Sequence, residues 1–223
     1  MNQNLLKQCI AEFIGTFALC FVGILAIHHS PGLPGLLGVA LAHGLTIAVM
    51  ASAFGAISGG QFNPAVSVAL FVAGKMDAMR AGAYIVTQLV AATAAGFLIM
   101  AVAGDGGRQI VSNGTPDLGA TVTQFQGILI EIVLTFFLVV VIFGTAVDSR
   151  APKMGGLAIG LAVVMDILAG GPISGAAMNP ARTFGPALAS GHWNNHLVYW
   201  IGPLVGGALA GLLYGRFLIK ESK

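Results

Sequence analysis

The stretches "SGGQFNPAV" (Ser58–Val66) and "SGAAMNPAR" (Ser174–Arg182) decide the fold of this chain. Both follow the pattern Ser-Gly-x-x-x-Asn-Pro-Ala, and the second begins 116 residues after the first. Asparagine is favoured just before a helix and proline at its first position, so each Asn-Pro pair predicts a helix start. The apolar segments that follow end at about Val72 and about Leu188. Helices of about nine residues span about 14 Å, which is only half of a membrane.

The composition places the chain among membrane proteins. Hydrophobic residues make up 57% of its 223 residues and charged residues only 8%, far from the balance of a soluble protein. The net charge of +2 gives no indication of nucleic-acid binding. We therefore predict an all-α membrane protein with six transmembrane helices and two re-entrant half-helices. The six apolar stretches lie at about residues 9–27, 36–56, 81–103, 126–147, 155–172 and 197–218.

Further similarities divide the chain into two related halves. The segment "AEFIGTF" with Glu12 resembles "IEIVLTF" with Glu131, and "YIVTQLVAATAAG" from Tyr84 resembles "YWIGPLVGGALAG" from Tyr199. Each half then holds three spans and one half-helix, and because three is odd, the second half crosses the membrane upside down. We predict a single channel domain over residues 1–223, made of a first repeat (1–103), an outer connecting loop (104–124) and an inverted second repeat (125–223).

This arrangement brings the two predicted helix starts together near the middle of the membrane. The positive N-terminal ends of the half-helices and the amides of Asn63 and Asn179 then face the same cavity. Such a cavity repels cations, including hydronium, while an amide still donates a hydrogen bond to a neutral molecule. One Asn-Pro-Ala segment is most often only a helix cap, but two copies at matching places in inverted halves favour a pore.

The distribution of basic residues predicts the orientation of the chain. We expect both termini in the cytoplasm and the chain in a plasma or inner membrane. Arg108 then falls on the outer side, and the inner side holds Lys7, Lys75, Arg80, Arg150, Lys153, Arg216, Lys220 and Lys223.

Taken together, these motifs resemble the aquaporin, or major intrinsic protein, family over nearly the whole chain. The resemblance implies a homotetramer in the lipid bilayer, with one pore in each chain. It also implies that the acids Glu12 and Glu131 hold the two re-entrant loops, rather than relaying protons. The pore motifs of the family correspond here to Asn63, Pro64, Ala65, Asn179, Pro180 and Ala181.

The narrowest point of the family, an aromatic and arginine filter, corresponds to His43, Ile167, Ala176 and Arg182. This His-Ile-Ala-Arg set resembles the tonoplast intrinsic subgroup of plants, which passes ammonia as well as water. An arginine at membrane depth is costly, which favours a pore role for Arg182 over a structural ion pair. Glycerol-conducting relatives differ at four further positions, where this chain has residues of the water type: Thr183, Ala187, Tyr199 and Trp200.

Several residues depart from the usual family pattern or allow two interpretations. Gln61 stands where the family usually has a histidine, so the lining stays polar but loses a titratable group. Ala176 stands where some relatives have the cysteine that mercurials block, which predicts no inhibition from this position. Asp166 is either a protonated or arginine-paired acid near the outer surface or a residue that orients the filter. Four histidines near the outer ends of spans are expected to be solvated: His28, His29, His192 and His196.

The leading functional hypothesis is a passive channel for water, with ammonia or other small neutral solutes as further substrates, that excludes protons and ions. A coupled secondary transporter is the main alternative, because such carriers also have inverted repeats. A glycerol-type facilitator and a structural junction protein are further alternatives. We expect no enzyme activity, cofactor or metal site, because no convergent set of nucleophile, base or metal ligands is present in the sequence.

Overall fold

The computed structural model describes residues 3–29, 35–152 and 154–219. This part of the chain contains helices and no strand, which confirms the predicted all-α class. Six helices are long and apolar enough to cross a membrane, so the chain is a multi-pass membrane protein. The first begins at Gln3, six residues before its predicted start. The six are α1 (Gln3–His28), α2 (Leu36–Ser58), α4 (Ala78–Val102), α6 (Gln124–Ile142), α7 (Gly156–Ser174) and α9 (Val198–Leu213).

The two half-helices form as the Asn-Pro pairs predict. Helix α3 (Pro64–Val72) has nine residues and α8 (Pro180–Ser190) has eleven. In α3 the side-chain oxygen of the N-cap Asn63 accepts a hydrogen bond from the backbone N–H of Ala65 at 2.9 Å. Each cap satisfies backbone donors that the first helical turn leaves free, which is why both helices start at the proline.

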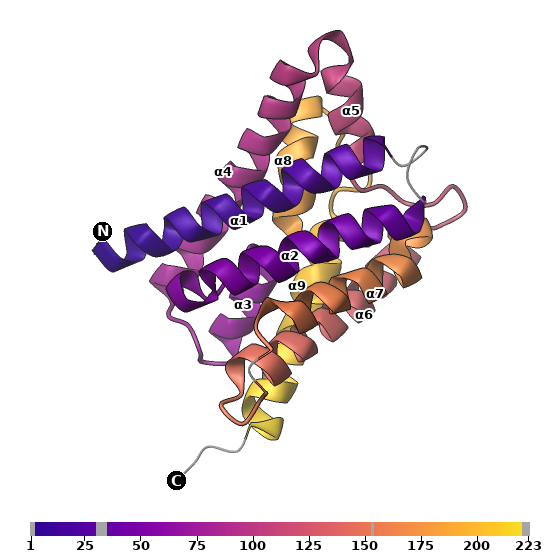
Figure 1. Ribbon diagram of the computed structural model, residues 1–223. Helices are drawn as coiled ribbons and strands as arrows, with labels where there is room; N and C mark the ends of the chain where they lie inside the picture. The colour runs from indigo at the N-terminus through magenta and orange to yellow at the C-terminus, as the bar shows by residue number, and fades with distance from the viewer. Residues whose placement is uncertain (1–2, 30–34, 153, 220–223) are drawn as a thin grey trace.

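The two halves of the chain pack against each other along α2 and α7. Gly44 of α2 and Gly160 of α7 lie 116 residues apart in sequence, and each approaches the backbone carbonyl of the other so closely that a β-carbon would collide with it. The small residues allow the two helices to come near van der Waals contact of their backbones, as is common in membranes. Figure 1 shows α1 and α2 side by side in front of α3 and α8.

The connection between the halves is not only a loop. Sequence analysis predicts an outer loop over 104–124, whereas the structure contains a short 3₁₀ turn (Gly104–Gly106) and a helix, α5 (Gly107–Gly114). Helix α5 folds back onto α4, because Gly107 packs against the backbone of Met100 without room for a side chain. Its glycines and asparagine give it little helix propensity, so packing stabilises it rather than local sequence.

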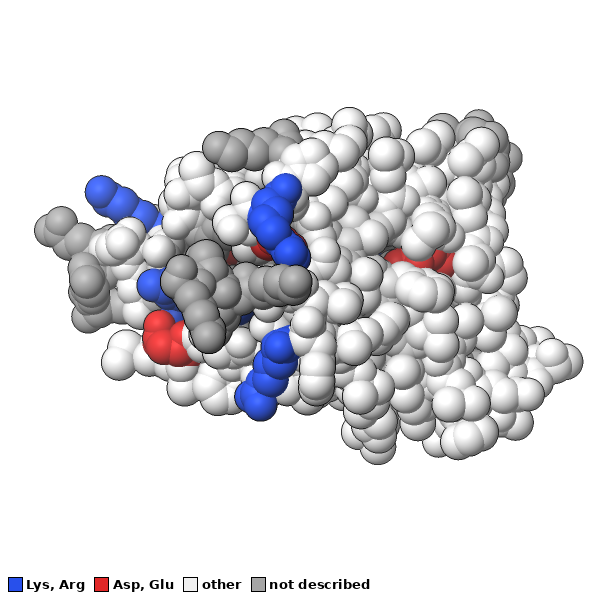
Figure 2. Space-filling view, turned by 90° about the horizontal axis from the view of Figure 1, so that it is seen from below, with Lys and Arg blue, Asp and Glu red and all other residues white. Residues whose placement is uncertain are grey.

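The ends of two spans are wider turns that continue the helices. Residues Phe143–Val147 extend α6 and Tyr214–Leu218 extend α9, both with π-type geometry. Figure 2 shows that the Lys and Arg side chains visible in this view lie toward one end of the molecule. Of the basic residues used to predict the orientation, Lys153, Lys220 and Lys223 lie outside the described residues.

Candidate functional site: a narrow cavity between two half-helices

The two re-entrant loops meet through their asparagines. The side-chain nitrogen of Asn63 donates a hydrogen bond to the carbonyl of Met178 at 2.7 Å, and that of Asn179 donates to the carbonyl of Phe62 at 2.9 Å. Each asparagine therefore caps its own half-helix and holds the opposite loop. An amide nitrogen carries two hydrogens, so after this bond each asparagine keeps one donor for another partner.

Left-handed backbone gives both loops the same shape. Phe62 (φ 52°) and Met178 (φ 51°) precede the two asparagines, and Gly60 (φ 61°) has its counterpart in Ala176 (φ 46°). This region is unfavourable for residues with a β-carbon, at a cost of about 1–3 kcal/mol each, so the surroundings must hold these residues in place. The conformation directs the Phe62 and Met178 carbonyls toward the asparagine of the other half.

Two buried acids hold the loops in this conformation. Glu12 accepts hydrogen bonds from the backbone N–H groups of Gln61 (2.9 Å) and Phe62 (2.6 Å) and from the hydroxyl of Ser58 (2.7 Å). Both of its oxygens are engaged, and Gln88 donates a further bond from α4 at 2.9 Å. The side chain is fully buried, so these donors replace the water it would otherwise bind.

Glu131 repeats this arrangement in the second half. It accepts hydrogen bonds from the N–H groups of Ala177 (2.9 Å) and Met178 (2.7 Å) and from the hydroxyl of Ser174 (2.7 Å). Pro203 stands at the position that corresponds to Gln88, so the second acid lacks the fourth donor. The expectation that the two acids act as acceptors for the loops agrees with these contacts.

A narrow cavity runs beside the two asparagines. Its volume is about 40 Å³, which is room for about three water molecules. Aliphatic side chains form most of the wall, including Val66, Leu138 and Val163. The polar side chains in the wall are His43, Gln61, Asn63, Asn179 and Arg182. A few donors in an apolar wall suit the passage of small neutral molecules in single file.

Arg182 and His43 face each other at the end of this cavity next to a larger vestibule. Arg182 Nη2 lies 3.4 Å from Nε2 of His43, and Nη1 donates to the carbonyl of Gly114 at 3.1 Å. Gly114 is the last residue of α5, where a helix has free carbonyls and a negative dipole end that favours a cation. Because guanidinium only donates, His43 Nε2 is the acceptor, and its Nδ1–H donates to the Val39 carbonyl at 2.9 Å.

The four residues predicted for the filter lie together. His43, Ile167, Ala176 and Arg182 all line the narrow cavity, and Ile167 and Arg182 also line a larger outer vestibule of about 450 Å³. Ile167 and Arg182 therefore lie at the junction of the two spaces. Among the described residues no carboxylate forms an ion pair with Arg182, whose side chain lines both spaces.

Comparison with known proteins agrees with this geometry. Residues 1–214 match the family model described as major intrinsic protein. The chain belongs to the major intrinsic protein family. It is 44% identical to Aquaporin TIP4-4 of Zea mays, over 99% of this chain and 90% of that protein. It is 45% identical to Aquaporin TIP4-1 of Arabidopsis thaliana, over 99% and 89%. These relatives confirm the resemblance to the tonoplast intrinsic subgroup.

The fold agrees with that of a solved member of the family. The aquaglyceroporin from Plasmodium falciparum superposes with a TM-score of 0.85, over 96% of this chain and 97% of that chain. The sequence identity is 22%, so the match concerns the fold alone. Members of the family are channels that pass water and small solutes across membranes.

The residues predicted as the water-type signature of the family lie in helix packing. Thr183, Ala187 and Tyr199 are fully buried and lie outside the described lining of the cavity. The hydroxyl of Tyr199 donates to the carbonyl of Ser174 at 2.9 Å and so supports the second loop. Trp200 is half-buried, and its indole N–H donates to His196 at 3.0 Å.

The surroundings of Asp166 and of two histidines differ from those expected. Asp166 is buried and is not among the residues that line the narrow cavity, and no described arginine forms an ion pair with it, so the arginine-paired alternative is wrong. His28 and His29 are exposed as predicted. His192 and His196 are only half-exposed because both form side-chain hydrogen bonds with neighbouring segments, and burial lowers the pKa of His196.

Several groups that form the site have no signature in the sequence. The carbonyls of Phe62, Met178 and Gly114 are backbone atoms, which no residue pattern reveals. Ser58 and Ser174 open the two repeated stretches, and their matching positions were the available signal for a role in holding the loops.

Proposed function

We propose that this protein is a passive membrane channel for water and ammonia that excludes protons and other ions. The proposal rests on one observation above all: the two asparagines that start opposed half-helices and one buried arginine line the same narrow cavity. The free donors of Asn63 and Asn179 orient a passing water molecule by its oxygen. Because both positive helix ends face the same point, a cation there is repelled while a neutral molecule is not.

The composition of the outer constriction supports ammonia as a second substrate. Ile167 presents an apolar side chain and Ala176 a small one, so His43 and Arg182 supply the polar side chains at this level. A constriction with few polar groups replaces few of the hydrogen bonds that a solute makes with water. Ammonia, a neutral molecule, loses less free energy than an ion when it leaves water, so it can pass such a constriction while an ion cannot. The tonoplast-type filter assigned from the sequence leads to the same substrate.

The remaining assignments complete the proposal. The pore motifs are the two Asn-Pro-Ala segments, and Glu12 and Glu131 support their loops. We place both termini in the cytoplasm, because of the basic residues at that end, and we propose a homotetramer with four separate pores. The water-type signature residues favour water over glycerol. Neither an enzyme reaction nor a cofactor is part of this proposal.

Stopped-flow light scattering on proteoliposomes tests the function. Reconstituted protein should shrink vesicles in an osmotic gradient much faster than protein-free vesicles, and an inward ammonia gradient should raise the internal pH faster. The double variant His43→Phe with Ile167→His should keep the water flux and lose the ammonia flux. Water flux equal to that of empty vesicles, in folded protein, would refute the open channel.

The same vesicles distinguish a passive channel from a coupled transporter. Flux through a channel is proportional to the solute gradient and independent of a proton or sodium gradient. Saturation of the flux, or its stimulation by one of these ion gradients, would favour a coupled transporter.

A further inference from the structure

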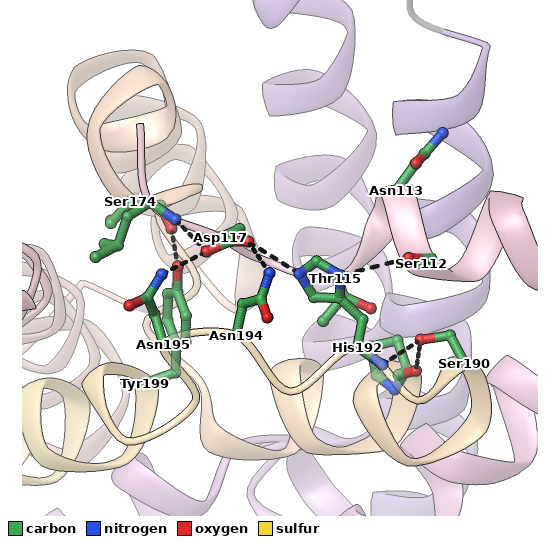
Figure 3. Close-up of polar contacts among 12 residues, drawn as sticks. Ser112, Asn113, Thr115, Asp117, Ser174, Ser190, His192, Asn194, Asn195 and Tyr199 are labelled. Carbon is green, nitrogen blue, oxygen red and sulfur yellow. Dashed lines mark hydrogen bonds and ion pairs between the residues drawn. The ribbon is translucent and has the colours of Figure 1, made fainter. Parts of the chain in front are cut away.

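An aspartate in the wall of the larger vestibule, outside the narrow cavity, connects two segments of the chain. Asp117 lies in the segment between α5 and α6, and it accepts four hydrogen bonds (Figure 3). One carboxylate oxygen accepts from the backbone N–H of Leu118 and from the amide of Asn195, both at 2.8 Å. The other accepts from Nε2 of His192 at 3.0 Å and from the amide of Asn194 at 3.3 Å.

Three of these donors, on His192, Asn194 and Asn195, come from the segment between α8 and α9, far from Asp117 in sequence. Burial raises the pKa of the Asp117 carboxyl, but the donors from Asn195, Leu118, His192 and Asn194 together bring the pKa below its ordinary value. The group is therefore a carboxylate in the neutral pH range. With all of its acceptor positions used, it has no capacity left to bind a solute, so a structural role fits it better than a binding role.

Two further contacts join α5 and α6, the helices on either side of the Asp117 segment, to the segment between α8 and α9. Gln124 donates to the side-chain oxygen of Asn195 at 3.0 Å, and Ser112 lies 3.4 Å from Nδ1 of His192. Asn195 itself is left-handed (φ 49°), a conformation that asparagine tolerates better than most residues. The segment is also joined to the end of α7, where the N–H of Gly119 donates to the carbonyl of Ile173 at 2.9 Å.

Asp117 is close in sequence to Gly114, the residue that binds Arg182. Only Thr115 and Pro116 separate Asp117 from Gly114, the residue whose carbonyl accepts the hydrogen bond from Arg182. The ring of Pro116 fixes its own φ torsion, and the Thr115 hydroxyl donates to the carbonyl of Val111 at 2.9 Å, so two of the restraints on this short link are local. A displacement of Asp117 is therefore transmitted to the Gly114 carbonyl instead of being absorbed by a flexible loop.

We propose that Asp117 is a positioning residue for the outer constriction: it fixes the Gly114 carbonyl, which holds Arg182 in the orientation that excludes solutes larger than water. This inference rests on the proposed function, in which Arg182 belongs to the filter. Without the four hydrogen bonds of Asp117, the guanidinium gains freedom to move aside. The passage then admits a larger neutral solute such as glycerol, while water continues to pass.

The ratio of glycerol to water permeability in the same proteoliposomes tests this role. Loss of folded protein lowers both fluxes by the same factor and leaves the ratio unchanged, whereas a wider constriction raises the ratio. We expect Asp117→Ala to raise it about tenfold, equivalent to about 1.4 kcal/mol of lost discrimination. Asp117→Asn keeps the shape and some of the bonds and should give a smaller rise. Asp105→Ala, a change at an exposed acid on the same outer side, is the matched control and should leave the ratio unchanged.

An Arg182→Val variant separates failure of this inference from failure of the proposed function. If Arg182→Val raises the ratio and both Asp117 variants leave it at the wild-type value, Asp117 has no positioning role and the filter assignment stands. If none of the three variants changes the ratio, both the inference and the filter assignment are wrong. If Asp117→Ala does not fold, Asp117→Asn decides the question by the same criterion.

Discussion

The acid that supports the second re-entrant loop gives a prediction whose size follows from its contacts. Glu131 accepts hydrogen bonds from two backbone N–H groups, those of Ala177 and Met178, and from the hydroxyl of Ser174. In Glu131→Gln one of the two acceptor oxygens becomes an amide nitrogen. Whichever way the new amide is turned, one of the two backbone N–H groups then faces a donor, since the serine hydroxyl can reverse its role but an N–H cannot.

A buried N–H without an acceptor costs about 1–3 kcal/mol, so we expect Glu131→Gln to lower the free energy of unfolding by about 2 kcal/mol. Glu131→Ala removes the acceptor for both N–H groups and should cost about twice as much, about 4 kcal/mol. The equivalent change Glu12→Gln leaves one N–H of the first loop without an acceptor and should cost about the same as Glu131→Gln.

The change should also reach the pore. The carbonyl of Met178 holds the side chain of Asn63, so a loosened second loop also releases the asparagine of the first half. We therefore expect Glu131→Gln to reduce the water permeability per folded protein as well as the stability. The stabilities can be measured by titrating detergent-solubilised protein with sodium dodecyl sulfate and following the fluorescence of Trp193 and Trp200.

Asp105→Asn, at an exposed position, serves as the control and should change the stability by less than about 0.5 kcal/mol. Two results would refute the reasoning. If Glu131→Gln unfolds at the same detergent fraction as the wild type, the hydrogen bonds of the acid do not stabilise the loop. If Glu131→Ala costs no more than Glu131→Gln, the cost does not come from the backbone donors.

Three further predictions concern single positions. Water permeability of the wild type should be insensitive to mercurials applied at the outer mouth, and Ala176→Cys should make it sensitive, because residue 176 lines the cavity; a mercury-sensitive wild type would contradict this. The water flux through Gln61→His should fall below about pH 6.5, where the new histidine gains a charge, whereas the wild-type flux should not depend on pH in this range. Equal pH profiles would show that residue 61 does not face the permeating water. The ion pair with Arg150 lowers the pKa of Asp148 to about 2, so the stability it contributes is present above about pH 4 and is lost as the pH falls toward 2. Asp148→Asn should therefore be less heat-resistant than the wild type at pH 6 and equal to it near pH 2, and a difference that persists at pH 2 would exclude this ion pair as its source.

How far the sequence predicts this protein can be followed at particular residues. Six long apolar stretches predict six spans, because the length of a membrane helix is set by the bilayer and not by neighbouring residues. Asn63 and Asn179 predict helix starts because capping is a local interaction. The repeated motifs then require an inverted arrangement, since an odd number of spans reverses the direction of the second half. These features depend only on interactions between residues close in sequence and on the number of spans in each half.

Other features came only from the tertiary structure. Helix α5 lies in a glycine-rich segment whose local propensity favours a loop, and packing against α1, α4 and α8 stabilises it as a helix. The partner of Arg182 is the carbonyl of Gly114, a backbone atom that every residue has, so no side-chain pattern identifies it. The four donors of Asp117 lie more than seventy residues away, except for its neighbour Leu118. Such contacts depend on the relative positions of distant segments, which short-range sequence patterns do not encode.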